Sequence, residues 1–269
     1  MYFAPEASLR ARLARHVRIL RVLAKTDFKF KYAGSVLGYV WSLGKPLVYF
    51  AVLWVVFQNI FKTRIDHFAL YLIVGVVLWT FVADAVTATF PSLVTRGSIL
   101  RRIAFPPIVI PVASTITALM SFGLNLIAVA VFLAANRIEP GLNWLLLIPL
   151  LVELYVFALA LALIAATFYV RYRDVGQIWE VGATIMFFSA PIIYPVALLP
   201  EWVGNIIAFN PFVQVLQDVR RVVLGPDANA VQLLGSNGNH IAPLGVLAIL
   251  VLLAVWSYRR EAPRFAELA

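Results

Sequence analysis

The stretch Thr26–Phe61, TDFKFKYAGSVLGYVWSLGKPLVYFAVLWVVFQNIF, decides how the rest of this chain is interpreted. It opens with lysines that alternate with aromatic residues and becomes almost wholly apolar from Val36 onward. A helix over the 26 residues of Val36–Phe61 would be about 39 Å long, enough to cross a hydrocarbon core of about 30 Å with some tilt. Basic and aromatic side chains suit the headgroup layer beside that core. The stretch therefore predicts an approach along the membrane surface followed by a first membrane span.

Composition places the whole chain in the membrane. Of its 269 residues, 62% are hydrophobic and only 13% are charged, which is too little charge to cover a water-soluble domain of this size. The net charge of +9 could suggest nucleic-acid binding. The lysines and arginines lie between apolar segments and not on one soluble face, so no nucleic-acid partner is expected. The absence of cysteine excludes disulfides and thiolate metal sites.

A basic helix is expected ahead of the first span, over residues 8–32. Its leucines and Val17 recur every three or four residues, whereas its arginines fall largely on other faces. This pattern is typical of an amphipathic helix that lies in the membrane surface against anionic lipid. A helix packed on a partner subunit is the alternative.

Six apolar segments predict membrane spans. They cover residues 36–61, 68–90, 108–135, 144–170, 181–199 and 241–258. The fifth contains Pro191 and Pro195, and residues 196–216 are broken again by Pro200 and Asn210-Pro211, which predicts a re-entrant or outer-surface helical hairpin before the last span. The expected fold class is an all-α polytopic membrane protein, with a single membrane domain filling residues 1–269.

The distribution of basic residues predicts the orientation of these spans. Of the 22 lysines and arginines, 17 lie in the segment through Lys45, in the loops 91–105 and 171–180 and in the tail, and only five lie on the opposite side. Cytoplasmic loops carry the excess of positive charge in membrane proteins. Both termini are therefore expected in the cytoplasm.

The chain carries no recognisable catalytic site. Gly38–Lys45, GYVWSLGK, differs from a P-loop because five residues separate its glycines and a proline follows its lysine. His16, His67 and His240 are far apart and lack metal-ligand spacing, and no two acids are close in sequence. We expect no catalytic residue, no metal and no cofactor bound by this chain.

Three polar residues inside the predicted spans are candidates for function, because such residues are costly in lipid. Asn125 and Glu153 lie at similar depth in the third and fourth spans, which permits a hydrogen bond between helices. Direct contact with a substrate is the alternative for this pair. Asp84 lies nearer the cytoplasm, where a structural bond or a hydrated gate is expected.

Aromatic residues of the first span recur at helical spacing. They are Tyr39, Phe50, Trp54, Phe57 and Phe61. Spacings of eleven, four, three and four residues favour one helix face. Such a face either packs against the core or lipid, or forms a path along which sugar rings slide.

Several motifs, taken in order, resemble one family. They are KFKYAGSVLGYVWSLGKPL (residues 29–47), VFQNIF (56–61), RGSILRRIAFPP (96–107), FYVRYRDV (168–175), SAPIIYP (189–195) and NPF (210–212). Together with the basic helix, they are similar to permease subunits of type-2 ABC transporters that export polysaccharides, O-antigens or teichoic acids. The resemblance runs from about residue 10 to residue 258.

This resemblance implies partners and site residues. The family functions as a homodimer with two separate ATPase subunits, which bind ATP and Mg²⁺. A coupling helix would lie within the loop 91–105, at about Thr95–Arg102. The implied ATPase-coupling residues are Arg96, Ser98, Ile99, Leu100, Arg101 and Arg102. Phe187 and Tyr194 would join the first-span aromatics along a channel at the dimer interface.

The implied function is export of a lipid-linked polysaccharide across the cytoplasmic (inner) membrane of a bacterium. Membrane lipids and the lipid-linked glycan would then be partners of the permease. Two alternatives remain open at the level of sequence. One is a type-2 ABC exporter of drugs or small lipids, and the other is a membrane enzyme that acts on lipid-linked sugars.

Overall fold

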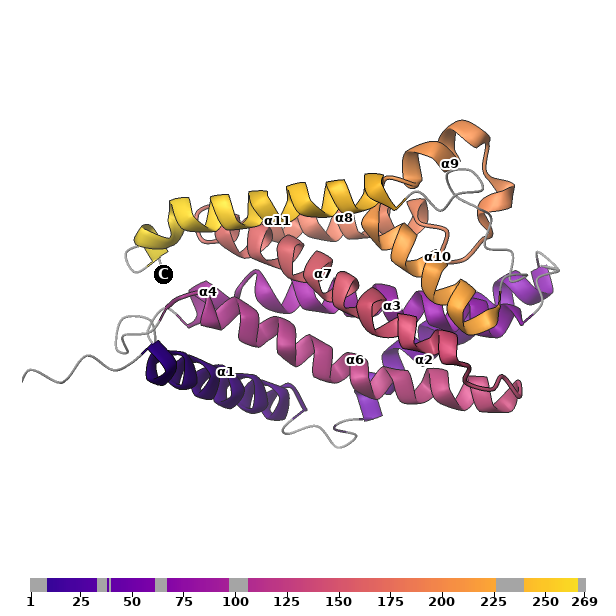
Figure 1. Ribbon diagram of the computed structural model, residues 1–269, viewed down its shortest axis with the longest axis horizontal. Coiled ribbons are helices and arrows are strands. Elements are labelled where there is room, and N and C mark those ends of the chain that lie inside the picture. The colour runs from indigo at the N-terminus through magenta and orange to yellow at the C-terminus, as the bar shows by residue number, and fades with distance from the viewer. Residues whose placement is uncertain are drawn as a thin grey trace, which may run out of the picture.

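The computed structural model describes residues 9–32, 38, 40–60, 67–96, 106–225 and 240–265, and within these ranges the chain is helical with no strand (Figure 1). The longer helices are α1 (Leu9–Tyr32), α2 (Val40–Val55), α3 (Phe68–Thr89), α6 (Val109–Ala135), α7 (Leu147–Tyr169), α8 (Val175–Ser189), α10 (Pro211–Leu224) and α11 (Ile241–Glu261). The shorter ones are α4 (Ser92–Thr95), α9 (Glu201–Ile207), a π-helical turn at Val56–Ile60, and 3₁₀ turns at Leu142–Leu146, Val196–Leu198 and Ala262–Arg264.

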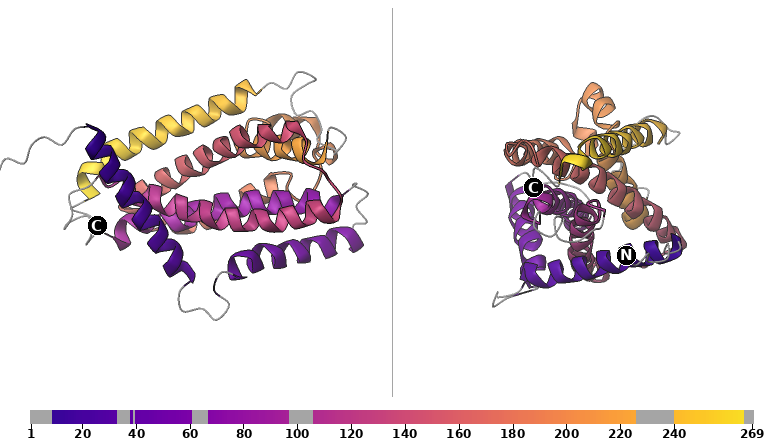
Figure 2. Two further views of the ribbon diagram at one scale, coloured as in Figure 1. Left: turned by 60° about the horizontal axis from the view of Figure 1, so that its bottom comes forward. Right: turned by 90° about the vertical axis from the view of Figure 1, so that its left-hand side faces the viewer.

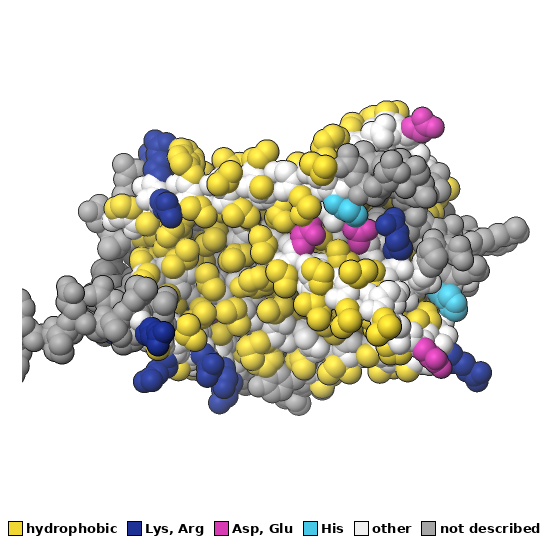
Figure 3. All heavy atoms as spheres, in the orientation of Figure 1, with side chains coloured by type: hydrophobic (Ala, Val, Ile, Leu, Met, Phe, Trp, Pro, Cys, Tyr) yellow, Lys and Arg dark blue, Asp and Glu magenta, His cyan; other side chains and the backbone are white. Residues whose placement is uncertain are grey.

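Among the described residues, five helices are long and apolar enough to cross a membrane. They are Val40–Gln58, Phe68–Thr89, Val109–Ala135, Leu142–Tyr169 and Ile241–Glu261. These segments agree within a few residues with five of the six predicted spans. The agreement follows from composition, because each segment must satisfy its own backbone within one helix. On the face drawn in Figure 3, hydrophobic side chains form a broad middle band, and lysines and arginines gather towards its two ends.

The predicted fifth span is not confirmed as a span. Helix α8 has 15 residues, about 22 Å at 1.5 Å per residue, which is short of a hydrocarbon core of about 30 Å. It begins at Val175, inside the predicted loop 171–180, and ends at Ser189. Ala190 has ψ 141° because the ring of Pro191 disfavours the helical conformation of the residue before it.

Helix α3 lies at the centre of the bundle and packs against α6, α7, α2 and α10. Its most apolar window is 78% buried, whereas that of α2 is only 11% buried. A helix that is apolar on every side is suited to such an enclosed position. Aromatic pairs join it to its neighbours, with Phe81 and Phe122 at a centroid distance of 4.9 Å and Trp79 and Phe212 at 5.4 Å.

The connections of the bundle fall at two opposite ends. Helix α4, the turn at 170–174 and the C-terminal 3₁₀ turn lie at the end near the C label of Figure 1, and α1 lies there too. Helices α9 and α10 lie towards the other end (Figure 1), where α7 and α11 also begin. This alternation agrees with the predicted arrangement, in which the basic segments share one side.

Helix α1 is inclined to the bundle and packs on α6 (Figure 2). Ala24 is 2% exposed at this contact, and Thr117 Oγ1 donates a hydrogen bond to the Ala24 carbonyl at 3.3 Å. Val17, Val22 and Phe30 on α1 are exposed. Exposed apolar side chains suit a helix at a membrane surface, and that placement stays a prediction.

Residues 196–224, where a helical hairpin was predicted over 196–216, form a 3₁₀ turn followed by the two helices α9 and α10. After the short α9, Asn210 caps α10 because its side-chain oxygen accepts a hydrogen bond from Phe212 N at 3.0 Å, and Pro211 occupies the first helical turn. Helix α10 extends to Leu224, eight residues beyond the predicted hairpin. How this pair of helices sits in the membrane remains a prediction.

Candidate functional site

Arg220 joins three separated parts of the chain in the interior. Its Nε and Nη2 donate to the Tyr71 carbonyl at 3.1 and 2.8 Å. Its Nη1 donates to the Pro191 carbonyl at 2.7 Å, and Nη2 also donates to the Ile192 carbonyl at 2.7 Å. The guanidinium lies over the Tyr71 ring, 3.4 Å from its centroid. The side chain is 0% exposed, so these four bonds replace its hydration.

These contacts fix the backbone of the residues that follow the end of α8. Carbonyls just beyond a helix terminus need donors, and the rigid fork of arginine supplies several in one plane. Tyr71 Oη adds a hydrogen bond to the Tyr194 carbonyl at 3.0 Å. Burial lowers the pKa of Arg220 to about 10, so the guanidinium is charged at neutral pH.

Gly75 provides the space that this arginine occupies. A Cβ atom built on Gly75 would lie 2.7 Å from Arg220 Nη2 and 3.1 Å from Ile192 Cγ2. The count of basic residues by loop treated Arg220 as a loop residue of the outer side and did not reveal that its side chain is buried in the interior. The sequence feature that could have indicated this burial is a basic residue among the apolar residues of α10.

An aromatic groove lies between α2, α3 and α8. The cavity has a volume of about 270 Å³ and is lined by Tyr49, Trp79, Thr80, Thr184, Phe187 and Phe188 among others. Phe187 is 3% exposed and packs against Tyr49, with ring centroids 5.5 Å apart. Tyr49 and Phe188 are 43% and 56% exposed. The groove therefore presents aromatic ring surfaces and threonine hydroxyl groups on its walls.

The first-span aromatics do not form one exposed face. Phe50 is buried and meets Phe132 of α6 edge-on at 5.1 Å, and Phe57 packs on Phe68 with centroids 6.4 Å apart. Only Trp54 among the described members is exposed. The π-helical turn from Val56 alters the residue spacing of a regular α-helix.

Other predicted path residues have different surroundings. Tyr194 Oη donates to the carbonyls of Phe188 and Ser189 at 2.8 and 3.2 Å, which caps the end of α8. Tyr39 and Phe61 lie outside the described residues. A role in a substrate path stays a prediction for all of these residues, and the structure adds Tyr49 and Phe188 as candidates that the spacing argument missed.

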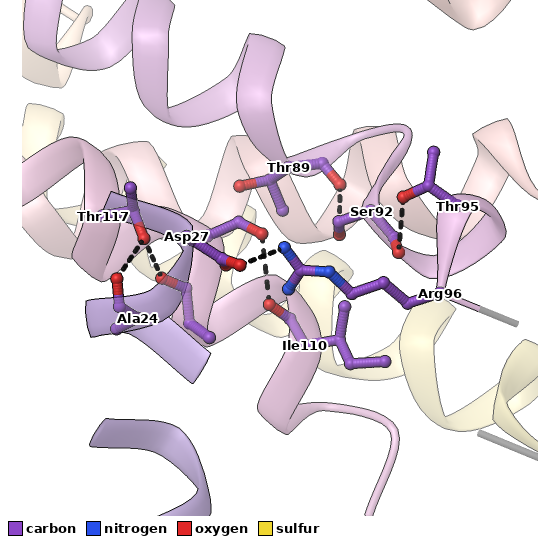
Figure 4. Close-up of polar contacts among 10 residues, drawn as sticks. Ala24, Asp27, Thr89, Ser92, Thr95, Arg96, Ile110 and Thr117 are labelled. Atoms are coloured by element: carbon purple, nitrogen blue, oxygen red, sulfur yellow. Dashed lines mark hydrogen bonds and ion pairs between the residues drawn. The ribbon is translucent and has the colours of Figure 1, made fainter. Parts of the chain in front are cut away.

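Arg96, at the beginning of the predicted coupling segment, is joined to α1 by an ion pair. It follows α4, and its Nη2 lies 2.6 Å from Oδ1 of Asp27, with both side chains mostly buried (Figure 4). Ser92 Oγ donates to the Thr89 carbonyl at 2.6 Å, and Thr95 Oγ1 donates to the Ser92 carbonyl at 3.2 Å. The other predicted coupling residues, Ser98, Ile99, Leu100, Arg101 and Arg102, lie outside the described residues.

Asp84 forms an ion pair with Lys31. A structural bond was one of the two roles predicted for this residue. Its Oδ2 lies 3.2 Å from Nζ of Lys31 on α1. The same ammonium donates to Ser121 Oγ of α6 at 3.2 Å. Lys31 therefore links α1 to both α3 and α6.

The predicted hydrogen bond between Asn125 and Glu153 is wrong. Within the described part of the chain, Asn125 Oδ1 and Glu153 Oε1 are buried without a hydrogen-bond partner. Glu153 lies instead near Asp218 of α10, with Gln214 and His240 close by. Similar depth in sequence did not specify which faces of α6 and α7 meet.

Asp218 is the shared partner in a polar cluster that it forms with Gln214, Arg221 and His240. Gln214 Nε2 donates to Asp218 Oδ2 at 3.1 Å, and His240 Nδ1 lies 3.5 Å from the same oxygen. Arg221 Nη1 donates to Asp218 Oδ1 at 3.4 Å. Among the described residues, no group of three or more histidines and acids is arranged to hold a metal ion.

Comparison with known proteins places these features in a family. The model of the ABC-2 type transporter family matches residues 18–224. The chain is 27% identical over 252 residues to the O-antigen export system permease protein RfbA of Klebsiella pneumoniae, covering 93% of this chain and 94% of that protein. It is also 27% identical over 256 residues to the protein of the same name from Myxococcus xanthus, with 93% and 94% covered. The chain therefore belongs to the ABC-2 type transporter family of membrane proteins.

Proposed function

We propose that this chain is the permease subunit of an ATP-driven exporter that moves a lipid-linked O-antigen, or a similar cell-envelope polysaccharide, across the inner membrane. The observation that carries the proposal is similarity to O-antigen export permeases over 93% of the chain. The five membrane-spanning helices and the aromatic groove agree with a transport role.

Energy for export would come from a partner. The chain contains no P-loop, so two ABC ATPase subunits would bind and hydrolyse ATP with Mg²⁺. Their docking surface would be the segment Thr95–Arg102. The ion pair between Arg96 and Asp27 supports this role, because movement at the end of α4 would be transmitted directly to α1.

The aromatic groove between α2, α3 and α8 suits a polymer that slides along it during export. Aromatic faces stack on the CH faces of sugar rings over a broad range of positions, and the hydroxyls of Thr80 and Thr184 can accept hydrogen bonds from sugar hydroxyls. Each contact is weak, so no single ring is trapped. A second copy of the chain would close the exposed sides of α2 and α8 into a channel, with both termini in the cytoplasm.

Deletion of the gene in its native host tests the function. Lipid-linked polysaccharide should accumulate on the cytoplasmic side of the inner membrane, and polysaccharide should disappear from the cell surface. A plasmid copy of the gene should restore export. The control is a strain in which only the Walker A lysine of the accompanying ATPase is replaced, which should show the same accumulation. Normal surface polysaccharide in the deletion strain would contradict the proposal.

A further inference from the structure

A second, more polar pocket lies where the end of α1 meets the beginning of α2 and the middle of α3. Its volume is about 430 Å³, and its wall includes Lys31, Trp41, Ser42, Lys45, Thr80 and Asp84. This volume is within the range of about 300–1,000 Å³ that is usual for small-molecule sites.

Charge in this pocket favours an anion. Two lysines face a single carboxylate, and Lys31 is already bonded to that carboxylate at 3.2 Å. Lys45 is exposed and forms no ion pair with any acid in the part of the chain that the structure describes. Lysine binds phosphate as a point charge, and the hydroxyl of Ser42 and the indole of Trp41 add further donors.

The pocket continues into the aromatic groove. Thr80 lines both cavities, and Lys45 precedes Tyr49 by one turn of α2, which places the two side chains on one face. A ligand whose charged end occupied the pocket could therefore extend along the groove. Val48 and Val52, three residues after Lys45 and Tyr49 respectively on α2, are exposed and would offer an apolar surface to a lipid tail.

We propose that this pocket binds the phosphate or diphosphate headgroup of a lipid at the membrane surface. The assignment rests on the proposed function, in which that lipid carries the glycan. Asp84 lowers the affinity of the pocket for the headgroup, because its carboxylate repels the negatively charged phosphate and competes with it for Lys31. An incoming phosphate would draw Lys31 away from Asp84 and so weaken the link between α1 and α3.

Lipid binding to the full-length permease tests the proposal directly. The purified chain in neutral detergent is titrated with polyprenyl diphosphate, phosphatidylglycerol or uncharged polyprenol, and bound lipid is counted by native mass spectrometry. Lys45→Gln should weaken binding of the phosphorylated lipid by about tenfold, the value of one charge-assisted hydrogen bond. Asp84→Asn should tighten it, a gain that misfolding does not produce. Arg259→Gln, at an exposed basic residue of α11 outside the pocket, is the control and should change nothing.

The three lipids separate the sources of the headgroup. Preference for polyprenyl diphosphate over phosphatidylglycerol supports binding of the transported lipid, whereas equal affinity overturns that role and assigns the pocket to membrane phospholipid. Equal binding by Lys45→Gln and Arg259→Gln, or weaker binding by Asp84→Asn, overturns the anion pocket itself. The measurement needs neither ATPase nor export, so its failure is distinct from failure of the proposed function.

Discussion

Replacing Gly75 by alanine should destabilise the permease specifically through Arg220. The added Cβ would lie 2.7 Å from Arg220 Nη2 and 3.1 Å from Ile192 Cγ2. Nη2 cannot withdraw freely, because it is bonded to the carbonyls of Tyr71 and Ile192. Overpacking of a filled interior costs about 1–3 kcal/mol, and each buried carbonyl that loses its donor adds about 1–3 kcal/mol.

The expected total of about 2–6 kcal/mol for overpacking and one lost donor is measurable as a fall in melting temperature of roughly 10 °C. Fluorescence-detected size-exclusion chromatography after stepped heating of the purified permease gives this value. Gly123→Ala on α6 is the matched control, since a Cβ atom added at Gly123 would meet no other atom within 4 Å. Alanine is the better helix former by about 1 kcal/mol, so the control should be unchanged or slightly stabilised.

A double-mutant cycle tests the physical reason. Arg220→Met should destabilise the protein by about 3–5 kcal/mol, because the carbonyls at the end of α8 lose their charged donor. In that background Gly75→Ala should cost at least about 1 kcal/mol less than in the wild type. A wild-type melting temperature for Gly75→Ala, or strictly additive effects in the cycle, would refute the reasoning.

Three further predictions concern the groove, the α1 contact and the orientation. Phe50→Ala should lower stability by about 3–5 kcal/mol because it leaves a cavity beside α6, whereas Phe188→Ala should reduce polysaccharide export at an unchanged melting temperature; equal melting temperatures for the two variants would contradict the assignment. Asp27→Asn should cost about 1–3 kcal/mol and uncouple export from ATP hydrolysis, with partial recovery when Arg96→Gln is added, and an unaltered ratio of transport to hydrolysis would rule out this link. Ser98→Cys should react with an impermeant thiol reagent only after cells are opened, and labelling of intact cells would exclude the proposed topology.

The amino-acid sequence by itself determined the place of five long apolar helices, although it also predicted a sixth span over a segment whose helix α8 is too short to be confirmed as one. Hydropathy acts locally, and in lipid a segment of about 20 apolar residues has no stable alternative to a helix. The motifs from residue 29 to residue 212 also pointed to the family that the comparison confirms. For Asp84 the sequence left a structural bond and a hydrated gate open, and the structure shows an ion pair with Lys31.

Only the tertiary structure decided which side of each helix is enclosed. In lipid, apolar side chains are equally suited to packing and to exposure, so the spacing of Phe50 and Trp54 could not reveal that one is buried and the other exposed. The same lack of contrast hid the faces on which Asn125 and Glu153 lie. Arg220 was missed for a related reason: its partners are backbone carbonyls of α3 and of the segment after α8, and these have no sequence signature because every residue carries a carbonyl group.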